Sequence, residues 1–214
     1  MTHIIFIAGA GQNKTAWDGV TATLPSDFTV HTFAATDLVS SGDTFSVQSC
    51  ASGLNDYMSE NNIEQAVFCG LSLGAMIWTE FAITHPEKVT SLVLCGSQVH
   101  PNPFLMSLQN GIMKLLPEKM LGLPPELTKQ QLLDILRASA SVDFRESVKS
   151  IKAPTLVVCG ANDKPNLPAA NYLAEHIPNA TLHIIPNAGH QVNISNSNEL
   201  QKVIVDFLNK PPSL

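Results

Sequence analysis

A serine, an aspartate and a histidine stand out in this 214-residue chain because their positions suit acyl-transfer chemistry. Ser72 lies between two glycines in the stretch GLSLG, Asp163 follows the apolar run TLVVCG, and His190 lies in the stretch NAGHQVN. A serine hydroxyl is a weak nucleophile at neutral pH unless a base takes its proton, and that base in turn needs an acid that orients it. Ser72, His190 and Asp163 are therefore candidates for the nucleophile, the base and the orienting acid.

Each of these residues also has a purely structural interpretation. A serine between two glycines can belong to an ordinary tight turn. Asp163 has the turn-forming neighbours Asn162 and Pro165, and His190 could be a polar loop residue. The catalytic interpretation is favoured because the contexts agree: Ser72 lies between the apolar run QAVFC and a helix-like stretch, and the other two residues each come after a further apolar run.

The glycine-rich stretch FIAGAGQNKTAW, residues 6–17, contains the end of the first apolar run. Attack on a carbonyl group creates an oxyanion, which backbone N–H groups stabilise when they are already in place. The predicted donors are the N–H groups of Ala10, in this stretch, and of Leu73, the residue after the candidate nucleophile. The stretch also suits a plain strand-to-helix turn, in which Gly9 and Gly11 serve only the backbone angles.

Short apolar runs alternate with helix-like stretches along the chain. The runs are continuous and rich in Val and Ile, which is typical of strands covered on both faces. This alternation predicts an α/β fold with a mostly parallel sheet of about six strands and helices on both faces. Because ligands bind outside the carboxyl ends of such strands, the three candidate residues should meet at that edge. The runs are HIIFIAG, FTVHTF, QAVFCG, SLVLCG, PTLVVCG and ATLHII.

One interval, residues 97–153, carries helix-like stretches in place of strands. In one of them, TKQQLLDILRASA, Thr128 and Gln131 form a capping-box pattern. We expect residues 1–96 and 154–214 to form the α/β core and residues 97–153 to form a small helical lid, inserted rather than independent. Plain helices packed on one face are the alternative. Four apolar residues of the insertion are candidates for a substrate-binding wall or for the insertion's own core: Phe104, Met106, Ile112 and Met113.

Composition argues against several classes of partner. Twelve basic against eighteen acidic residues leave a net charge of −6, with no Lys/Arg cluster that could neutralise a row of phosphates, so nucleic acid is not expected. No apolar stretch is long enough for a membrane span, and the start of the chain has no basic export signal. The four cysteines lack the paired spacing of a metal site, so we expect buried thiols, no metal and a cytoplasmic location. The oligomeric state is not readable from the chain.

Long stretches of the chain resemble the α/β-hydrolase superfamily, of the small esterase and enol-lactone hydrolase type. IIFIAGAGQNKTAW is similar to the family's oxyanion loop, and GLSLGAMIWTEFAITHPEKVTSLVLCG to its nucleophile elbow, helix and next strand. IKAPTLVVCGANDKPN and NAGHQVN resemble its acid and histidine loops. The resemblance implies that Ser72, Asp163 and His190 form a catalytic triad, in the chain order expected of the family. Two strands that usually precede the oxyanion-loop strand have no room here, which implies a sheet of six.

The resemblance implies a serine hydrolase that cleaves a small carboxylic ester, lactone or thioester through an acyl-enzyme. Its partner would be a small-molecule substrate, with no cofactor. The same triad also serves carbon–carbon bond hydrolases and elimination enzymes, and some relatives are ligand receptors with little turnover, so these alternatives stay open.

One departure from the family lies in the oxyanion loop. Where the family often has a His-Gly pair, this chain has Ala8 and Gly9. A side chain that commonly braces the loop is therefore missing, which predicts a looser loop and modest activity.

Overall fold

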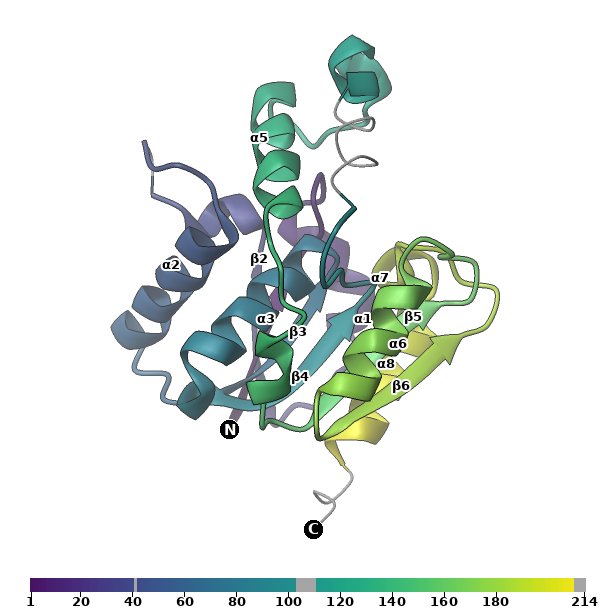
Figure 1. The fold of residues 1–214 in the computed structure, drawn as a ribbon. Coiled ribbons are helices and arrows are strands. Elements are labelled where there is room, and N and C mark those ends of the chain that lie inside the picture. The colour runs from purple at the N-terminus through teal and green to yellow at the C-terminus, as the bar shows by residue number, and fades with distance from the viewer. Residues whose placement is uncertain (41, 103–110, 210–214) are drawn as a thin grey trace.

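Six strands form one parallel sheet (Figure 1). The structure is a computed structural model that describes residues 1–40, 42–102 and 111–209. Its strands follow the spatial order β2-β1-β3-β4-β5-β6, and every neighbouring pair is parallel. All residues of β3 and β5 are buried, which explains why apolar residues follow one another in these runs instead of alternating with polar ones. The predicted sheet is confirmed. The strands are β1 (Thr2–Ile7), β2 (Phe28–Phe33), β3 (Ala66–Leu71), β4 (Val89–Cys95), β5 (Thr155–Gly160) and β6 (Ala180–Ile185).

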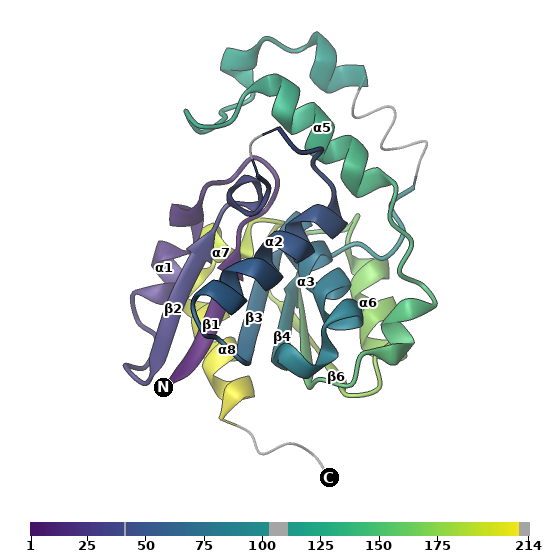
Figure 2. The same ribbon diagram turned by 90° about the vertical axis from the view of Figure 1, so that its left-hand side faces the viewer.

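Helices cover both faces of the sheet, as predicted (Figures 1 and 2). Successive strand residues point to opposite faces. In β3, Phe68 therefore joins one apolar core and Val67 the other. The Phe68 core is completed by α2 (Val47–Glu60), α3 (Leu73–Thr84) and α6 (Leu167–His176), and the Val67 core by α1 (Asp18–Thr21), α7 (Val192–Ser195) and α8 (Ser197–Leu208).

Two helical elements differ from the sequence-based expectation. The helix-like stretch TAWDGVTATL, residues 15–24, which separates the first two apolar runs, is instead a 3-10 turn, η1 (Lys14–Trp17), followed by the single turn of α1. Gly19 and the β-branched residues after it are weak helix formers, which explains the shorter element. The four-residue helix α7 was not expected, because it is too short to show a hydrophobic period. The other 3-10 turns are η2 (Ala35–Leu38), η3 (Pro86–Lys88), η4 (Glu118–Met120) and η5 (Ser147–Ser150).

The insertion between β4 and β5 is helical where the structure describes it. Its main helix is α5 (Lys129–Ala140), and residues 111–115 are also helical. The backbone N–H of Gln131 donates to Thr128 Oγ1 (3.2 Å), and the N–H of Thr128 donates to Gln131 Oε1 (2.9 Å), so the predicted capping box is confirmed. Figure 2 shows α5 above the end of the sheet at which the strands finish. In the described ranges no helix is both long and apolar enough to cross a bilayer.

The contact between α3 and β1 leaves no room for a side chain at Gly74. A Cβ there would lie 2.3 Å from the carbonyl oxygen of Ile7 and 2.8 Å from its carbonyl carbon. We expect Gly74→Ala to lower the free energy of unfolding by about 1–3 kcal/mol, because the backbone must shift to relieve this overlap. Urea unfolding followed by circular dichroism measures the change.

Gly111→Ala is the matched control for this prediction. A Cβ at Gly111 would meet no atom of the described chain within 4 Å, and residue 111 is also helical. Alanine is a better helix former than glycine by about 1 kcal/mol, so this variant should be neutral or slightly stabilised. An equal effect of the two substitutions would show that the close packing of α3 on β1 is not the cause.

Candidate active site

Ser72 is the single residue that joins the end of β3 to the start of α3. Its backbone has φ 53° and ψ −111°, a conformation that residues with a side chain seldom adopt. The turn is held by two hydrogen bonds: the N–H of Ser72 donates to the carbonyl of Cys95 (2.8 Å), and the N–H of Met76 donates to the carbonyl of Ser72 (3.0 Å). Gly70 permits the turn, because a Cβ there would come within 2.5 Å of Trp78. The sharp strand-turn-helix expected around Ser72 is therefore present.

Asp163 and His190 contact each other directly. His190 Nδ1 lies 2.7 Å from Asp163 Oδ2. Asp163 follows β5 and His190 follows β6, and these two strands are neighbours in the sheet. A carboxylate only accepts hydrogen bonds, so Nδ1 carries the proton and donates it. In the neutral ring Nε2 is then an unprotonated acceptor, which is the form that a general base requires. The side chain of Asp163 is 4% exposed and that of His190 39%, so the acid is shielded while the base is accessible.

Asn166 adds a contact that the sequence analysis did not identify. Its Nδ2 donates to both carboxylate oxygens of Asp163, at 2.7 and 2.9 Å, and Asn166 is itself buried. Gln98 Nε2, from the loop after β4, donates to Asn166 Oδ1. Asn166 Nδ2 also lies 3.0 Å from His190 Nδ1, but both nitrogens carry hydrogens, so this is a contact and not a hydrogen bond. The amide therefore satisfies the buried carboxylate and fixes its plane.

Gly96 lies between the serine turn and the histidine. It follows Cys95, whose carbonyl accepts the hydrogen bond from Ser72. A Cβ on Gly96 would lie 3.1 Å from His190 Cε1 and Nδ1, and 3.4 Å from Asp163 Oδ2. Loops after β3, β4, β5 and β6 thus meet at one edge of the sheet, and they bring the three predicted residues into one region.

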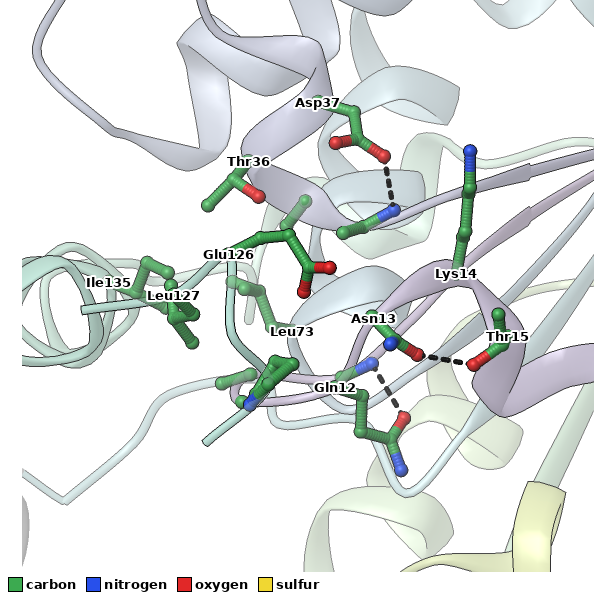
Figure 3. A pocket seen from close by; sticks show the side chains of 16 residues that line it. Gln12, Asn13, Lys14, Thr15, Thr36, Asp37, Leu73, Glu126, Leu127 and Ile135 are labelled. Atoms are coloured by element: carbon green, nitrogen blue, oxygen red, sulfur yellow. Dashed lines mark hydrogen bonds between the residues drawn. The ribbon is translucent and has the colours of Figure 1, made fainter. Parts of the chain in front are cut away.

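A cavity of about 330 Å³ opens beside the serine turn (Figure 3). Both predicted oxyanion donors, Ala10 and Leu73, line it. Leu73 begins α3, and the first N–H groups of a helix lack partners within the helix. Across the described ranges, neither the N–H of Ala10 nor that of Leu73 donates to a protein acceptor. The two donors therefore remain available to a ligand oxygen.

The family model described as "Alpha/beta hydrolase family" matches residues 4–200 of the chain. This chain belongs to the alpha/beta hydrolase family. The hydrolase is 25% identical over 243 residues to the Yersinia enterocolitica protein RutD, named as a carbamate hydrolase, with 96% of this chain and 86% of that protein covered. It is 25% identical over 230 residues to the pimeloyl-acyl-carrier-protein methyl ester esterase of Nitrosomonas europaea. That alignment covers 87% of this chain and 88% of the esterase. The solved structure of the enol-lactonase of Burkholderia xenovorans shares the fold, with a TM-score of 0.85 and 19% sequence identity. The match covers 98% of this chain and 92% of the enol-lactonase.

The walls of the cavity in this hydrolase come from four parts of the chain. Glu126 points its carboxylate into the cavity from the insertion, as Figure 3 shows. Asp37, in contrast, accepts a hydrogen bond from the N–H of Ala34 (2.9 Å). The lining residues are 9–15 of the oxyanion loop, 34–37 after β2, Leu73, and Pro124, Glu126, Leu127 and Ile135 of the insertion.

Two of the four apolar residues predicted as a substrate wall, Ile112 and Met113, are not among the described residues that line this cavity. Ile112 is 52% exposed, and Met113 packs against the core that contains Phe68. Phe104 and Met106 lie outside the described residues. The insertion instead contributes the residues just before α5 and one on α5 itself. No short pattern in the sequence distinguishes them from their neighbours.

The four cysteines of the hydrolase are free and buried. Burial raises the pKa of Cys50 to about 12 and that of Cys159 to about 11, and it also raises the pKa of Cys69, which lies beside Cys95. Throughout the described ranges, no group of three His, Cys, Asp or Glu side chains is arranged to hold a metal ion.

We expect these thiols to be unreactive in the folded protein. The thiolate is the reactive form, and at pH 8 only about one Cys159 thiol in a thousand is ionised. Ellman's reagent at pH 8 should therefore release almost no chromophore from the native protein within minutes, and four equivalents after denaturation in guanidinium chloride. Rapid reaction of one equivalent in the native state would contradict the burial of the thiols.

Proposed function

We propose that this hydrolase cleaves a small carboxylic ester, lactone or thioester through a Ser-His-Asp triad and an acyl-enzyme. The observation that carries the proposal is the 2.7 Å contact between His190 Nδ1 and Asp163 Oδ2, at the same sheet edge as the strained turn of Ser72. This contact leaves Nε2 of His190 as the base that a serine nucleophile needs. The esterase and carbamate hydrolase named above act, by name, on acyl groups of the same general kind, which supports the proposal.

In the proposed first half-reaction, Ser72 Oγ attacks the carbonyl carbon while His190 Nε2 takes its proton. The negative charge on the carbonyl oxygen is held by the N–H groups of Ala10 and Leu73. The intermediate then collapses, the bond to the leaving group breaks, and His190 returns the proton to the leaving oxygen or sulfur. Asp163 keeps the imidazole in one tautomer and stabilises its positive charge.

In the second half-reaction, His190 takes a proton from water, and the resulting hydroxide attacks the acyl-enzyme. Collapse releases the carboxylic acid and returns the proton to Ser72. The chemistry needs no cofactor. We also propose that residues 97–153 act as a lid, since Pro124, Leu127 and Ile135 cover the cavity beside the oxyanion donors. A volume of about 330 Å³ lies at the small end of ligand pockets and favours a small acyl group. The four buried, unpaired thiols favour a cytoplasmic setting.

Labelling with a fluorophosphonate tests the proposal. This reagent forms a covalent bond to an activated serine, so intact-mass spectrometry should show one adduct, and peptide fragmentation should place it on Ser72. Protein unfolded in urea, in which the triad is dispersed, should remain unlabelled. A parallel panel of short p-nitrophenyl esters and lactones should show turnover. Absence of an adduct and of turnover, or an adduct on another serine, would overturn the proposal.

A further inference from the structure

The oxyanion loop is closed by a side chain that the mechanism above does not use. The backbone N–H of Gln12 donates to the carbonyl of Gly9 (3.0 Å), and the N–H of Gly9 donates back to Gln12 Oε1 (3.1 Å). Ala10 lies inside this turn, between the two residues that the bonds join. A glycine-rich loop has many backbone conformations open to it, and the second bond removes much of that freedom. The direction of the Ala10 N–H therefore depends on Gln12.

Gln12 is in turn held by Asn193. Asn193 Nδ2 donates to Gln12 Oε1 (3.2 Å) and to the carbonyl of Ala16 (3.2 Å), while Gln12 Nε2 donates to Asn193 Oδ1 (3.4 Å). A carbonyl oxygen has two lone pairs, so Gln12 Oε1 accepts from both Gly9 and Asn193. Asn193 is completely buried, where an amide without partners would be costly.

These bonds connect a loop residue and a helix residue that are 181 residues apart in the chain. Gln12 follows β1, whereas Asn193 lies on α7, three residues after His190. The loop that carries one oxyanion donor and the loop that carries the base are thereby joined through a pair of side-chain amides. Ala8, in contrast, is completely buried and carries no polar side-chain atom that could hold the loop.

We propose that Gln12 and Asn193 are positioning residues. They orient the N–H of Ala10 toward the oxyanion and fix its position relative to His190. This inference rests on the proposed function. We call the hydrogen bonds between Gly9, Gln12 and Asn193 the clamp. An oxyanion donor contributes most when it is already oriented before the reaction, so loss of the clamp should raise the energy of the transition state more than it weakens substrate binding. These bonds hold a loop in which Ala8 stands where the family often has a bracing histidine.

The main test replaces Gln12, which is partly exposed, instead of the buried Asn193. With p-nitrophenyl acetate, Gln12→Ala should lower kcat about ten- to a hundredfold and change KM less than about threefold. The affinity for an alkyl boronic acid, which forms a tetrahedral adduct with the serine, should fall by a similar factor. Gln12→Glu keeps the oxygen that accepts from Gly9 and Asn193, and should restore most of kcat.

Gln201→Ala is the matched control. Gln201 Nε2 donates to the carbonyl of Thr23 (3.1 Å), so this variant loses a side-chain amide hydrogen bond between parts of the chain 178 residues apart, and neither residue lines the cavity. It should keep the kcat of the original protein. An unchanged kcat in Gln12→Ala, a rise of KM alone, or an equal loss in Gln201→Ala would overturn the inference.

Hydrogen exchange separates failure of this inference from failure of the proposed function. In Gln12→Ala, the peptide that contains Gly9 should exchange its amide hydrogens faster than in the original protein, whether or not the protein is active. If Gln12→Ala exchanged faster but the original protein neither took up the fluorophosphonate nor hydrolysed esters, the proposed function would be refuted, and with it a catalytic role for the clamp. A labelled, active original protein whose Gln12→Ala variant shows no faster exchange would refute the clamp alone.

Discussion

Ser72→Ala should lower kcat/KM for the best ester of the panel by about 10⁴-fold or more and should abolish fluorophosphonate labelling. The substitution removes the only atom that forms the acyl bond in the proposed mechanism, while the oxyanion donors remain. Alanine meets the same backbone strain as serine at φ 53°, so the thermal midpoint should change little. Initial rates, intact mass and differential scanning fluorimetry measure the three effects.

An exposed serine supplies the control for this prediction. Ser150, the last residue of η5, donates its hydroxyl to the carbonyl of Ser147 (2.7 Å), and it does not line the cavity beside the oxyanion donors. Ser150→Ala should label and turn over as the original protein does. If Ser72→Ala kept more than about a hundredth of the original rate with an intact fold, Ser72 could not be the nucleophile.

Asp163→Asn should lower kcat by about 10⁴-fold while changing the shape of the side chain very little. The carboxylate of Asp163 accepts from His190 on one oxygen and from Asn166 on both. An asparagine at this position has one oxygen and one NH₂ group, so it offers an acceptor at only one of the two positions, and its NH₂ group must face a donor of either Asn166 or His190. When its NH₂ group faces Nδ1, the imidazole takes the tautomer that carries the proton on Nε2, and it can no longer act as a base. Steady-state rates and an intact far-ultraviolet circular dichroism spectrum measure the outcome.

Asp143→Asn is the matched control for Asp163→Asn. Asp143 is an exposed aspartate whose carboxylate forms an ion pair with Arg145 (2.6 Å). Because exposed ion pairs contribute little to stability, this variant should keep the original rate. A loss at Asp163 of less than about tenfold would show that the aspartate does not orient the base.

The sheet and the turn at Ser72 could be predicted because their signals are local. The run AVFC is apolar at every position, and every residue of β3 is buried, so the apolar pattern follows from burial on both faces of the sheet. Gly70 and Gly74 are needed because a Cβ at either would overlap a neighbour, and those overlaps lie within one strand, one helix and the strand beside them. Asp163 and His190 follow strand ends, and a parallel sheet brings all such ends to one edge.

The rest of the site depends on contacts between segments that no local pattern links. Asn166 is a polar residue near a proline in the sequence, and only the folded loop turns its amide onto Asp163. The bond from Gln12 to Asn193 needs α7, a helix too short to be expected. In the described part of the insertion, the cavity wall comes from Leu127 and its neighbours, which line the cavity together with the oxyanion loop.

The chain order of the candidate site also has a consequence for biosynthesis. Its parts run from Ala10, in the loop after the first strand, to Asn193, just before the last helix. A nascent chain that already contains β1, β3 and the turn at Ser72 still lacks both the histidine and the amide that holds Gln12. Premature termination before His190 therefore leaves the candidate nucleophile without the proposed base, so we expect a chain that is still incomplete on the ribosome to be inactive.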